Sequence, residues 1–167
     1  MRARFAIHSA LREAPLERDH VVQLCAFRVG DEKYALDLRR VEEIIRPPQP
    51  ARIPREPAFI EGVFNLRGAI VPIVDLRKRF GLMARSLGAK ARCIVCRLAQ
   101  DRVAVLVDGG TEVVRVRIAD LRPAPPITCA GAKPYVIGVC GAGDELTLLL
   151  DLKALFQSAP RGAGDST

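Results

Sequence analysis

The sequence predicts a mainly β protein made of two small packed barrels with short helices. Short apolar segments alternate with polar residues, as Val22, Leu24 and Ala26 do near the start. Glycine pairs and proline-rich stretches separate these segments, and the pattern of the first half returns in the second. Aliphatic side chains must build the core, because the 167 residues include no tryptophan and only 5% aromatic residues.

The first half of the chain has four segments with a strand pattern and one helix start. Turns at Gly30 and at Arg67-Gly68 separate the strands of each pair, and residues 39–46 fit a short helix or a strand equally well. Five prolines between residues 47 and 57 enforce an extended loop, because proline fixes φ and donates no hydrogen bond. Asp75 is a suitable N-cap for a short helix. The expected strands are 22–27, 34–38, 63–66 and 69–74, and the expected helix is 76–80.

The second half repeats this plan. Gly109-Gly110 is expected to break the chain, and a second proline-rich loop follows at residues 123–126. Asp151 caps a last short helix that ends at Phe156. The expected strands are 93–98, 103–107, 113–118, 136–140 and 145–150.

Matched spacings indicate an internal duplication. Thirteen residues separate Gly62 from Asp75, and thirteen also separate Gly138 from Asp151. Each of these aspartates is followed five residues later by a phenylalanine. Two copies of a strand-rich unit of about sixty residues therefore predict two barrels of similar build.

The same repeat sets the expected domain limits. The spacing from Asp31 to Glu43 matches that from Asp101 to Glu112 within one residue. One domain is expected over residues 21–156, with subdomains at about 21–80 and 92–156. Composition predicts that residues 1–20 form a flexible N-terminal tail and residues 157–167 a disordered C-terminal tail.

The net charge of +7 is concentrated in residues 76–102. This segment carries eight arginine or lysine residues against Asp101 alone. It can be read as a solvated linker, as a patch for an acidic partner or as a nucleic-acid site. Barrels that bind single strands add exposed aromatic residues for base stacking, and the segment holds only Phe80, which the repeat places in the core. A small-barrel nucleic-acid-binding protein therefore stays open as the alternative function.

Groups for catalysis or metal binding do not form a recognisable pattern. Cys93-x-x-Cys96 is a single pair without histidine partners, and strand residues three apart face opposite sides. Phosphate-loop and nucleophile motifs are lacking too. Five cysteines in apolar surroundings indicate reduced thiols, and neither a signal peptide nor an apolar run of membrane-spanning length is found. The sequence predicts a cytoplasmic, non-enzymatic protein with no cofactor and no metal.

One segment resembles a known family. Residues 57–80 read PAFIEGVFNLRGAIVPIVDLRKRF, which is similar to the signature segment of the CheW family of chemotaxis adaptors. VEEI at 41–44, VDG at 107–109 and LRPAPP at 121–126 extend the match, so that the resemblance spans residues 21–156. It implies two packed five-stranded SH3-like barrels around a shared hydrophobic seam, with exchange of terminal strands between them. Residues 128–135 match no pattern of the family.

The resemblance also implies partners and contact residues. Family members couple chemoreceptors to a CheA-type histidine kinase by binding the receptor's cytoplasmic tip and the kinase's regulatory domain. The same partners are expected here, at receptor arrays, with no nucleic acid and no direct insertion into the membrane. The sequence does not choose between flagellar chemotaxis, type IV pili and cyclic-dinucleotide control. The candidate contact residues are Val41, Glu43, Gly62 and Arg67, which match contact positions of the family, Gly109, which matches a family glycine, and Asn65, which like Arg67 lacks a folding explanation.

Overall fold

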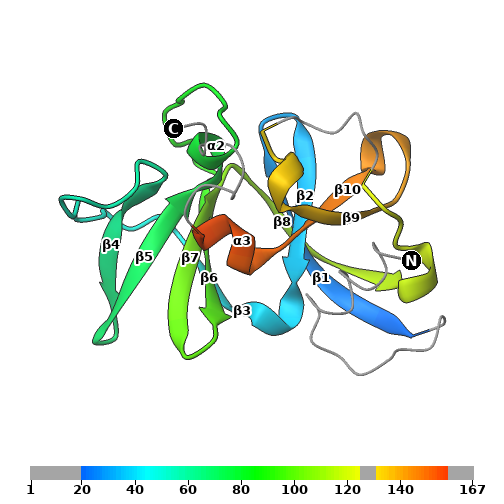
Figure 1. Cartoon of the computed structure of the whole chain (residues 1–167), viewed down its shortest axis with the longest axis horizontal. Coiled ribbons are helices and arrows are strands. Elements are labelled where there is room, and N and C mark those ends of the chain that lie inside the picture. The colour runs from blue at the N-terminus through cyan, green and yellow to red at the C-terminus, as the bar shows by residue number, and fades with distance from the viewer. Residues whose placement is uncertain (1–19, 125–130, 158–167) are drawn as a thin grey trace, which may run out of the picture.

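The computed structural model describes residues 20–124 and 131–157. It contains two five-stranded sheets, each curled into a small barrel, that lie side by side (Figure 1). The fold is therefore mainly β with short helices, as the sequence predicts. The tails expected at 1–20 and 157–167 lie outside the described residues, apart from His20 and Gln157, and so does Cys129.

One sheet, here called barrel A, combines strands from both ends of the chain. Its strands run in the order β8-β1-β2-β10-β9, and each neighbouring pair is antiparallel except β2 and β10, which are parallel. The strands of barrel A are β1 (Val21–Val29), β2 (Glu32–Asp37), β8 (Gly109–Arg117), β9 (Val136–Cys140) and β10 (Thr147–Leu150).

The other sheet, barrel B, is built from the middle of the chain. Its order is β3-β6-β7-β5-β4, and the single parallel pair is β5 with β7. The strands of barrel B are β3 (Val41–Ile45), β4 (Ile60–Leu66), β5 (Ala69–Asp75), β6 (Arg92–Leu98) and β7 (Asp101–Val107).

The two sequence repeats exchange strands reciprocally. The first repeat supplies β1 to β5, and the second supplies β6 to β10. Each barrel combines the first two strands of one repeat with the last three strands of the other. The ranges of about 21–80 and 92–156 therefore describe the repeats, while each barrel draws on both of them.

The register of the strands preserves the repeat. Gly62 pairs with Ile73 in barrel B, and the equivalent Gly138 pairs with Leu149 in barrel A. The parallel pairs are equivalent as well, because Ile73 faces Ala104 and Leu149 faces Ala35. The two barrels are therefore related residue by residue, so that a position in one can be compared with its counterpart in the other.

Short helices follow the last strand of each repeat. The carboxylate of Asp75 accepts a hydrogen bond from the Arg77 amide at 2.9 Å, and that of Asp151 accepts one from Lys153 at 3.1 Å. Each N-cap satisfies an amide that the first helical turn leaves unpaired. The helices are α2 (Leu76–Arg79) and α3 (Leu152–Phe156), and the 3₁₀ turns are η1 (Leu38–Arg40), η2 (Ile118–Asp120), η3 (Lys133–Tyr135) and η4 (Gly143–Glu145).

Local differences from the sequence prediction have simple causes. Residues 39–46 contain both of the alternatives, since η1 leads directly into β3. The chain break predicted at Gly109-Gly110 is wrong, because both glycines belong to β8, where positive φ angles of 141° and 65° bend the strand. The strand expected from residue 145 starts at Thr147, because η4 occupies the turn before it.

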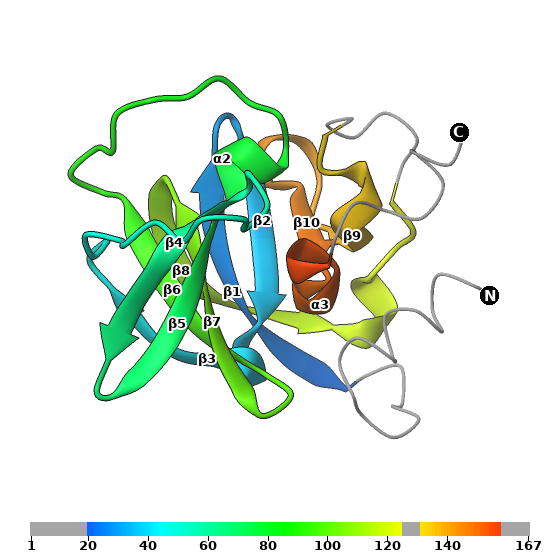
Figure 2. The ribbon, with the colours of Figure 1, turned by 60° about the vertical axis from the view of Figure 1, so that its left-hand side comes forward.

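The described residues form three hydrophobic clusters. The largest lies between the barrels and includes the rings of Phe27, Tyr34, Phe80 and Tyr135, whose successive centroids are 6.3, 5.0 and 5.9 Å apart. Helix α3 lies over this seam (Figure 2). The other two clusters fill the interiors of barrel A and barrel B. Several strands thus bury apolar side chains on both faces, which explains their nearly continuous apolar sequences.

Candidate functional site

An exposed ion pair joins the two edge strands of barrel B. Arg67 lies at the tip of the β4–β5 hairpin, and Glu43 lies on β3. Nη2 of Arg67 donates to Oε1 and Oε2 of Glu43 at 2.5 and 2.6 Å. Because β3 and β4 are the outermost strands of the sheet, this contact depends on the sheet curling into a barrel. The Arg67 side chain is 67% exposed, so it keeps donors available for a partner.

The hairpin turn holds Arg67 in a defined position. Arg67 has a φ of 50°, which few residues other than glycine adopt, and Gly68 has a φ of 87°. Oδ1 of Asn65 accepts a hydrogen bond from the Gly68 amide at 2.9 Å. Asn65 therefore stabilises the turn that presents Arg67, which gives it the folding explanation that it lacked in the sequence prediction.

Gly62 and Gly109 are positions where two backbones approach closely. A β carbon at Gly62 would lie 2.5 Å from the carbonyl oxygen of Ala51, and one at Gly109 would lie 2.7 Å from that of Lys90. Both glycines also have positive φ, 148° and 141°. These contacts explain the two glycines by packing, since only glycine fits there without strain.

Val41 lies on β3 beside the seam between the barrels. It pairs with Cys96, and its half-buried side chain packs against the shared core. A bulge between Val41 and Glu43 changes the register of β3, so that Glu43 pairs with Val95. Val95 belongs to the interior cluster of barrel B, and Glu43 therefore lies on the opposite face of β3 from Val41. The structure thus brings Glu43 together with Arg67 of the adjoining hairpin, while Val41 on the same strand faces the shared core.

The other candidate residues lie apart from this hairpin contact. Gly62 supports the proline-rich loop, which is bound to β4 by two hydrogen bonds of 2.8 and 2.9 Å between Ala51 and Val63. Gly109 lies where the chain passes from barrel B into barrel A. Ile44, next to Glu43, is 41% exposed, and the sequence pattern did not predict this exposure. Which side chains of the half-buried strand β3 face solvent can be told only from its register.

Most cations of the basic segment 76–102 are bound within the protein. Arg79 stacks on aromatic rings, with its guanidinium carbon 3.6 Å from the centre of Phe59 and 4.8 Å from that of Tyr135. Burial lowers the pKa of Arg79. Arg92 donates to the carbonyl oxygen of Ala91 at 2.7 Å. The remaining internal pairs are Arg77 with Asp108, Lys78 with Glu61, and Arg97 and Arg102 with Glu42.

Two cations of this segment form neither an ion pair nor a ring contact among the described residues. They are Arg85 and Lys90, and both lie in the loop between α2 and β6. Met83 in the same loop is 85% exposed. The segment therefore does not form a continuous basic groove of the kind that follows a nucleic-acid backbone.

The four cysteines that the structure describes are buried free thiols. Cys93 lies in the interior of barrel B and Cys96 in the shared core, so the two thiols of the CxxC pattern face opposite sides of β6. Burial raises the pKa of Cys25 to about 11 and that of Cys93 to about 12, and it raises those of Cys96 and Cys140 as well. The described residues contain no group of three or more side chains suited to hold a metal ion.

A sequence profile described as CheW-like domain matches residues 23–160. The chain belongs to the CheW-like family. None of the helices in the described ranges is long and apolar enough to cross a membrane.

Similar proteins agree with this assignment. The chemotaxis protein CheW of Klebsiella aerogenes is 37% identical over 132 residues, which cover 79% of this chain and 80% of that protein. Protein FrzA of Myxococcus xanthus is 30% identical over 139 residues, covering 82% and 86% of the two chains. The crystal structure of the scaffolding protein TtCheW from Thermoanaerobacter tengcongensis superposes with a TM-score of 0.76 at 30% identity, covering 84% of this chain and 95% of that one.

Proposed function

We propose that this protein is a non-enzymatic adaptor that couples chemoreceptors to a CheA-type histidine kinase in the cytoplasm. Membership of the CheW-like family supports a chemotaxis scaffold. The coupling to a receptor tip and to the kinase's regulatory domain is the further step that we propose. The similarity to FrzA as well as to CheW proteins leaves the pathway open, so the proposal concerns the type of partner rather than one signalling route.

The observation that carries this proposal is the Glu43–Arg67 ion pair. It is rigidly presented by a hairpin turn and is still exposed, which are the properties of a preorganised contact. Arginine is enriched among the few residues that dominate interface energies. The positive φ angles of Arg67 and Gly68 are those of a two-residue hairpin turn, and this turn leaves the long cation exposed at the tip.

An adaptor of this kind works through binding alone. It transmits a signal only if it binds two states of a receptor or kinase with different affinity, because a ligand cannot shift an equilibrium otherwise. The charged hairpin offers such a partner a directional polar contact, because the Arg67 side chain is 67% exposed. Complementary charge at this contact would favour the correct partner over others.

Direct binding experiments test the proposal. We expect Arg67→Ala and Glu43→Ala to weaken binding to a receptor cytoplasmic fragment or to the kinase regulatory domain by about tenfold or more, roughly 1.4 kcal/mol. Arg85→Ala is the matched control, because it removes an exposed arginine far from β3 in sequence. Wild-type affinity of both variants for both partners would exclude the hairpin from the site.

The nucleic-acid alternative is tested by titration with random single-stranded oligonucleotides. Because most of the basic segment is paired internally, we expect no saturable binding at physiological salt. Tight binding that falls steeply with salt concentration would favour the alternative.

A further inference from the structure

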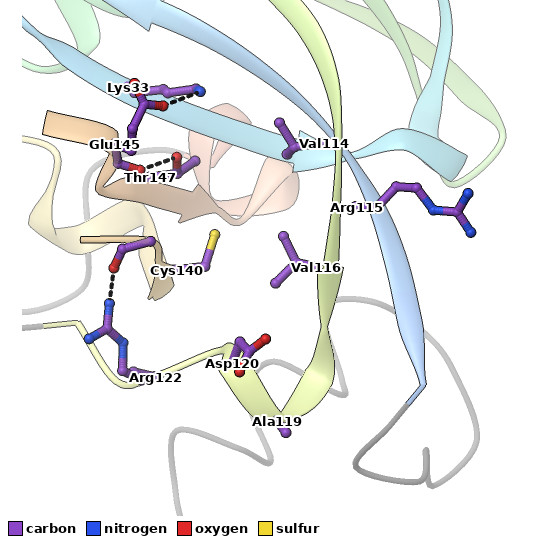
Figure 3. A pocket seen from close by; sticks show the side chains of 11 residues that line it. Lys33, Val114, Arg115, Val116, Ala119, Asp120, Arg122, Cys140, Glu145 and Thr147 are labelled. Carbon is purple, nitrogen blue, oxygen red and sulfur yellow. Dashed lines mark hydrogen bonds and ion pairs between the residues drawn. The ribbon is translucent and has the colours of Figure 1, made fainter. Parts of the chain in front are cut away.

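Barrel A has an open cavity at its edge. The cavity has a volume of about 580 Å³ and lies between β8 on one side and β9 with η2 on the other. The side chains of Val114 and Val116 point into it from β8, and the thiol of Cys140 points into it from β9 (Figure 3). These three side chains form an apolar part of the lining, and the polar part is formed by Lys33, Asp120, Arg122, Glu145 and Thr147.

Comparison with barrel B explains why the cavity exists. Cys140 of barrel A is the counterpart of Phe64 of barrel B, because Cys140 pairs with Thr147 in the same register as Phe64 pairs with Val71. The phenyl ring of Phe64 is 8% exposed and belongs to the interior cluster of its barrel. A thiol therefore occupies the place of a phenyl ring, and the missing volume is left open at the edge of barrel A.

Both barrels are otherwise closed in the same way. The loop before β9 forms a bridge between Arg122 and Val139, with hydrogen bonds of 2.9 and 2.8 Å. This bridge is the counterpart of the one between Ala51 and Val63 in barrel B. Among the described residues the loop contact is thus the same in both barrels, and the difference at this place is the smaller side chain of Cys140.

The strand that borders the cavity has a free edge. β8 is nine residues long and, within the part of the chain that the structure describes, pairs with β1 alone. An unpaired edge of this length offers a row of amide and carbonyl groups to another strand. Its side chains alternate, because Val114 and Val116 point inward while Arg115 points away from the cavity (Figure 3).

The charges beside this edge are not balanced. Arg117 pairs with Asp120 at 3.1 Å, whereas Arg122 donates to the carbonyl of Gly141. Among the described residues, neither Arg115 nor Arg122 pairs with a carboxylate. The outer side of this edge therefore carries Arg115 beside the exposed Val113, while its inner side is apolar at Val114 and Val116 and carries the Lys33–Glu112 ion pair further along β8.

We propose that the open edge of β8 binds an extended segment of a partner protein as an added strand. The segment alternates large apolar and acidic residues. One apolar side chain fills the place that Phe64 fills in barrel B, and the acidic side chains lie beside Arg115 as cross-strand pairs. The added strand would complete barrel A without any change in its fold.

This site is separate from the Glu43–Arg67 hairpin, which belongs to barrel B. The inference therefore does not rest on the proposed coupling of receptor and kinase. The opposing possibility is that the charged side chains of β8 serve to keep other strands away, as charges on natural edge strands often do.

The test uses a five-residue peptide in which glutamate alternates with phenylalanine and valine, acetylated and amidated at its ends. We expect it to shift the amide signals of β8 in NMR spectra of the full chain at millimolar concentration. The β8 amides that point away from β1 should also exchange more slowly with solvent. Peptides with alanine in place of the apolar residues, or with lysine in place of glutamate, should bind about tenfold more weakly or worse.

Two variants separate this proposal from unspecific binding. Cys140→Phe fills the cavity from inside, and Arg115→Glu reverses the charge beside it; each should weaken the peptide about tenfold, while Arg85→Glu should not. Thermal melts show whether the Cys140→Phe protein folds. If it does not, the Arg115→Glu variant alone tests the proposal, because Arg115 is exposed and its substitution leaves the fold intact. No saturable binding, signals shifted at the hairpin instead of β8, or equal effects of Arg115→Glu and Arg85→Glu would each overturn the proposal.

Discussion

Glu43 and Glu112 occupy equivalent positions in the two barrels but pair with different cations. Each lies on an edge strand and faces the same position of the neighbouring strand. Glu43 pairs with Arg67 at the hairpin tip, whereas Glu112 pairs with Lys33 of β2, both at 2.5 Å. The Arg67 side chain is 67% exposed and the Lys33 side chain 9% exposed. The same carboxylate position therefore pairs with an exposed cation in barrel B and with a buried cation in barrel A.

Exchanging the charges of the exposed pair separates its structural role from its role in recognition. Glu43→Arg combined with Arg67→Glu restores an ion pair, so the melting temperature should return to near the wild-type value. An exposed ion pair contributes only about 0–1 kcal/mol to the free energy of unfolding, so each of the two single variants should also fold. Binding to the receptor fragment and the kinase domain should stay weak, because the partner then meets the wrong charge. Recovered binding in the double variant would make the pair a purely structural contact.

The buried cation of barrel A should matter more for stability. Lys33 contacts both Glu112 and Glu145, and Lys33→Ala leaves the barrel end without this link. We expect a loss of about 1–3 kcal/mol in the free energy of unfolding, measured by urea denaturation. Glu145→Gln is the control: its side chain is 72% exposed and Glu112 remains, so its effect should stay below about 0.5 kcal/mol. Similar losses in both variants would contradict this interpretation.

Gly62 and Gly68 provide a matched pair for backbone packing. Both have positive φ, but only at Gly62 would a β carbon meet another backbone, whereas at Gly68 nothing lies within 4 Å. Gly68→Ala should cost about 1 kcal/mol for its conformation. Gly62→Ala should cost about 2–4 kcal/mol, since the loop at Ala51 must also move. Chemical denaturation measures the difference, and equal losses would show that the loop yields easily.

Buried thiols should make stability depend on alkaline pH. The pKa of Cys93 is raised by burial from 9.0 to about 12, so the native state keeps a proton that the unfolded chain releases above pH 9. The thiol's contribution is thus fully present below pH 9 and is lost as the pH rises toward 12. We expect a lower free energy of unfolding at pH 10.5 than at pH 8, by up to about 1.4 kcal/mol per pH unit and buried thiol. A smaller decline in Cys93→Val would identify this thiol as one source, and an unchanged decline would exclude it.

The sequence predicted the repeat unit well, because turns, caps and alternation are local features. Asp75 and Asp151 cap helices where they were expected. Strand exchange is different, because each repeat offers the same edges and the same apolar faces. Pairing within one repeat and pairing between two repeats satisfy the same residue pattern, so the exchange was expected only from the family resemblance, and the three-dimensional structure shows which strands take part.

The candidate site shows the same limit. Glu43 and Arg67 were singled out separately, and nothing local to either residue reveals that they meet, because barrel closure brings them together. The turn made by Asn65 and Gly68 is a local pattern that could have been recognised from the sequence. The cavity beside Cys140 could not, since a missing phenyl ring is noticed only against its counterpart Phe64.

The reciprocal exchange has a consequence for the order of folding during synthesis. All five strands of barrel B have been made once Val107 has left the ribosome. β1 and β2 are made first, yet their partners β8 and β10 come last, so they stay without a complete sheet until Leu150 is made. During synthesis the chain therefore contains a complete barrel B while β1 and β2 still lack their partner strands. We expect a chaperone or a second nascent chain to bind at these two strands, because their edges are unpaired.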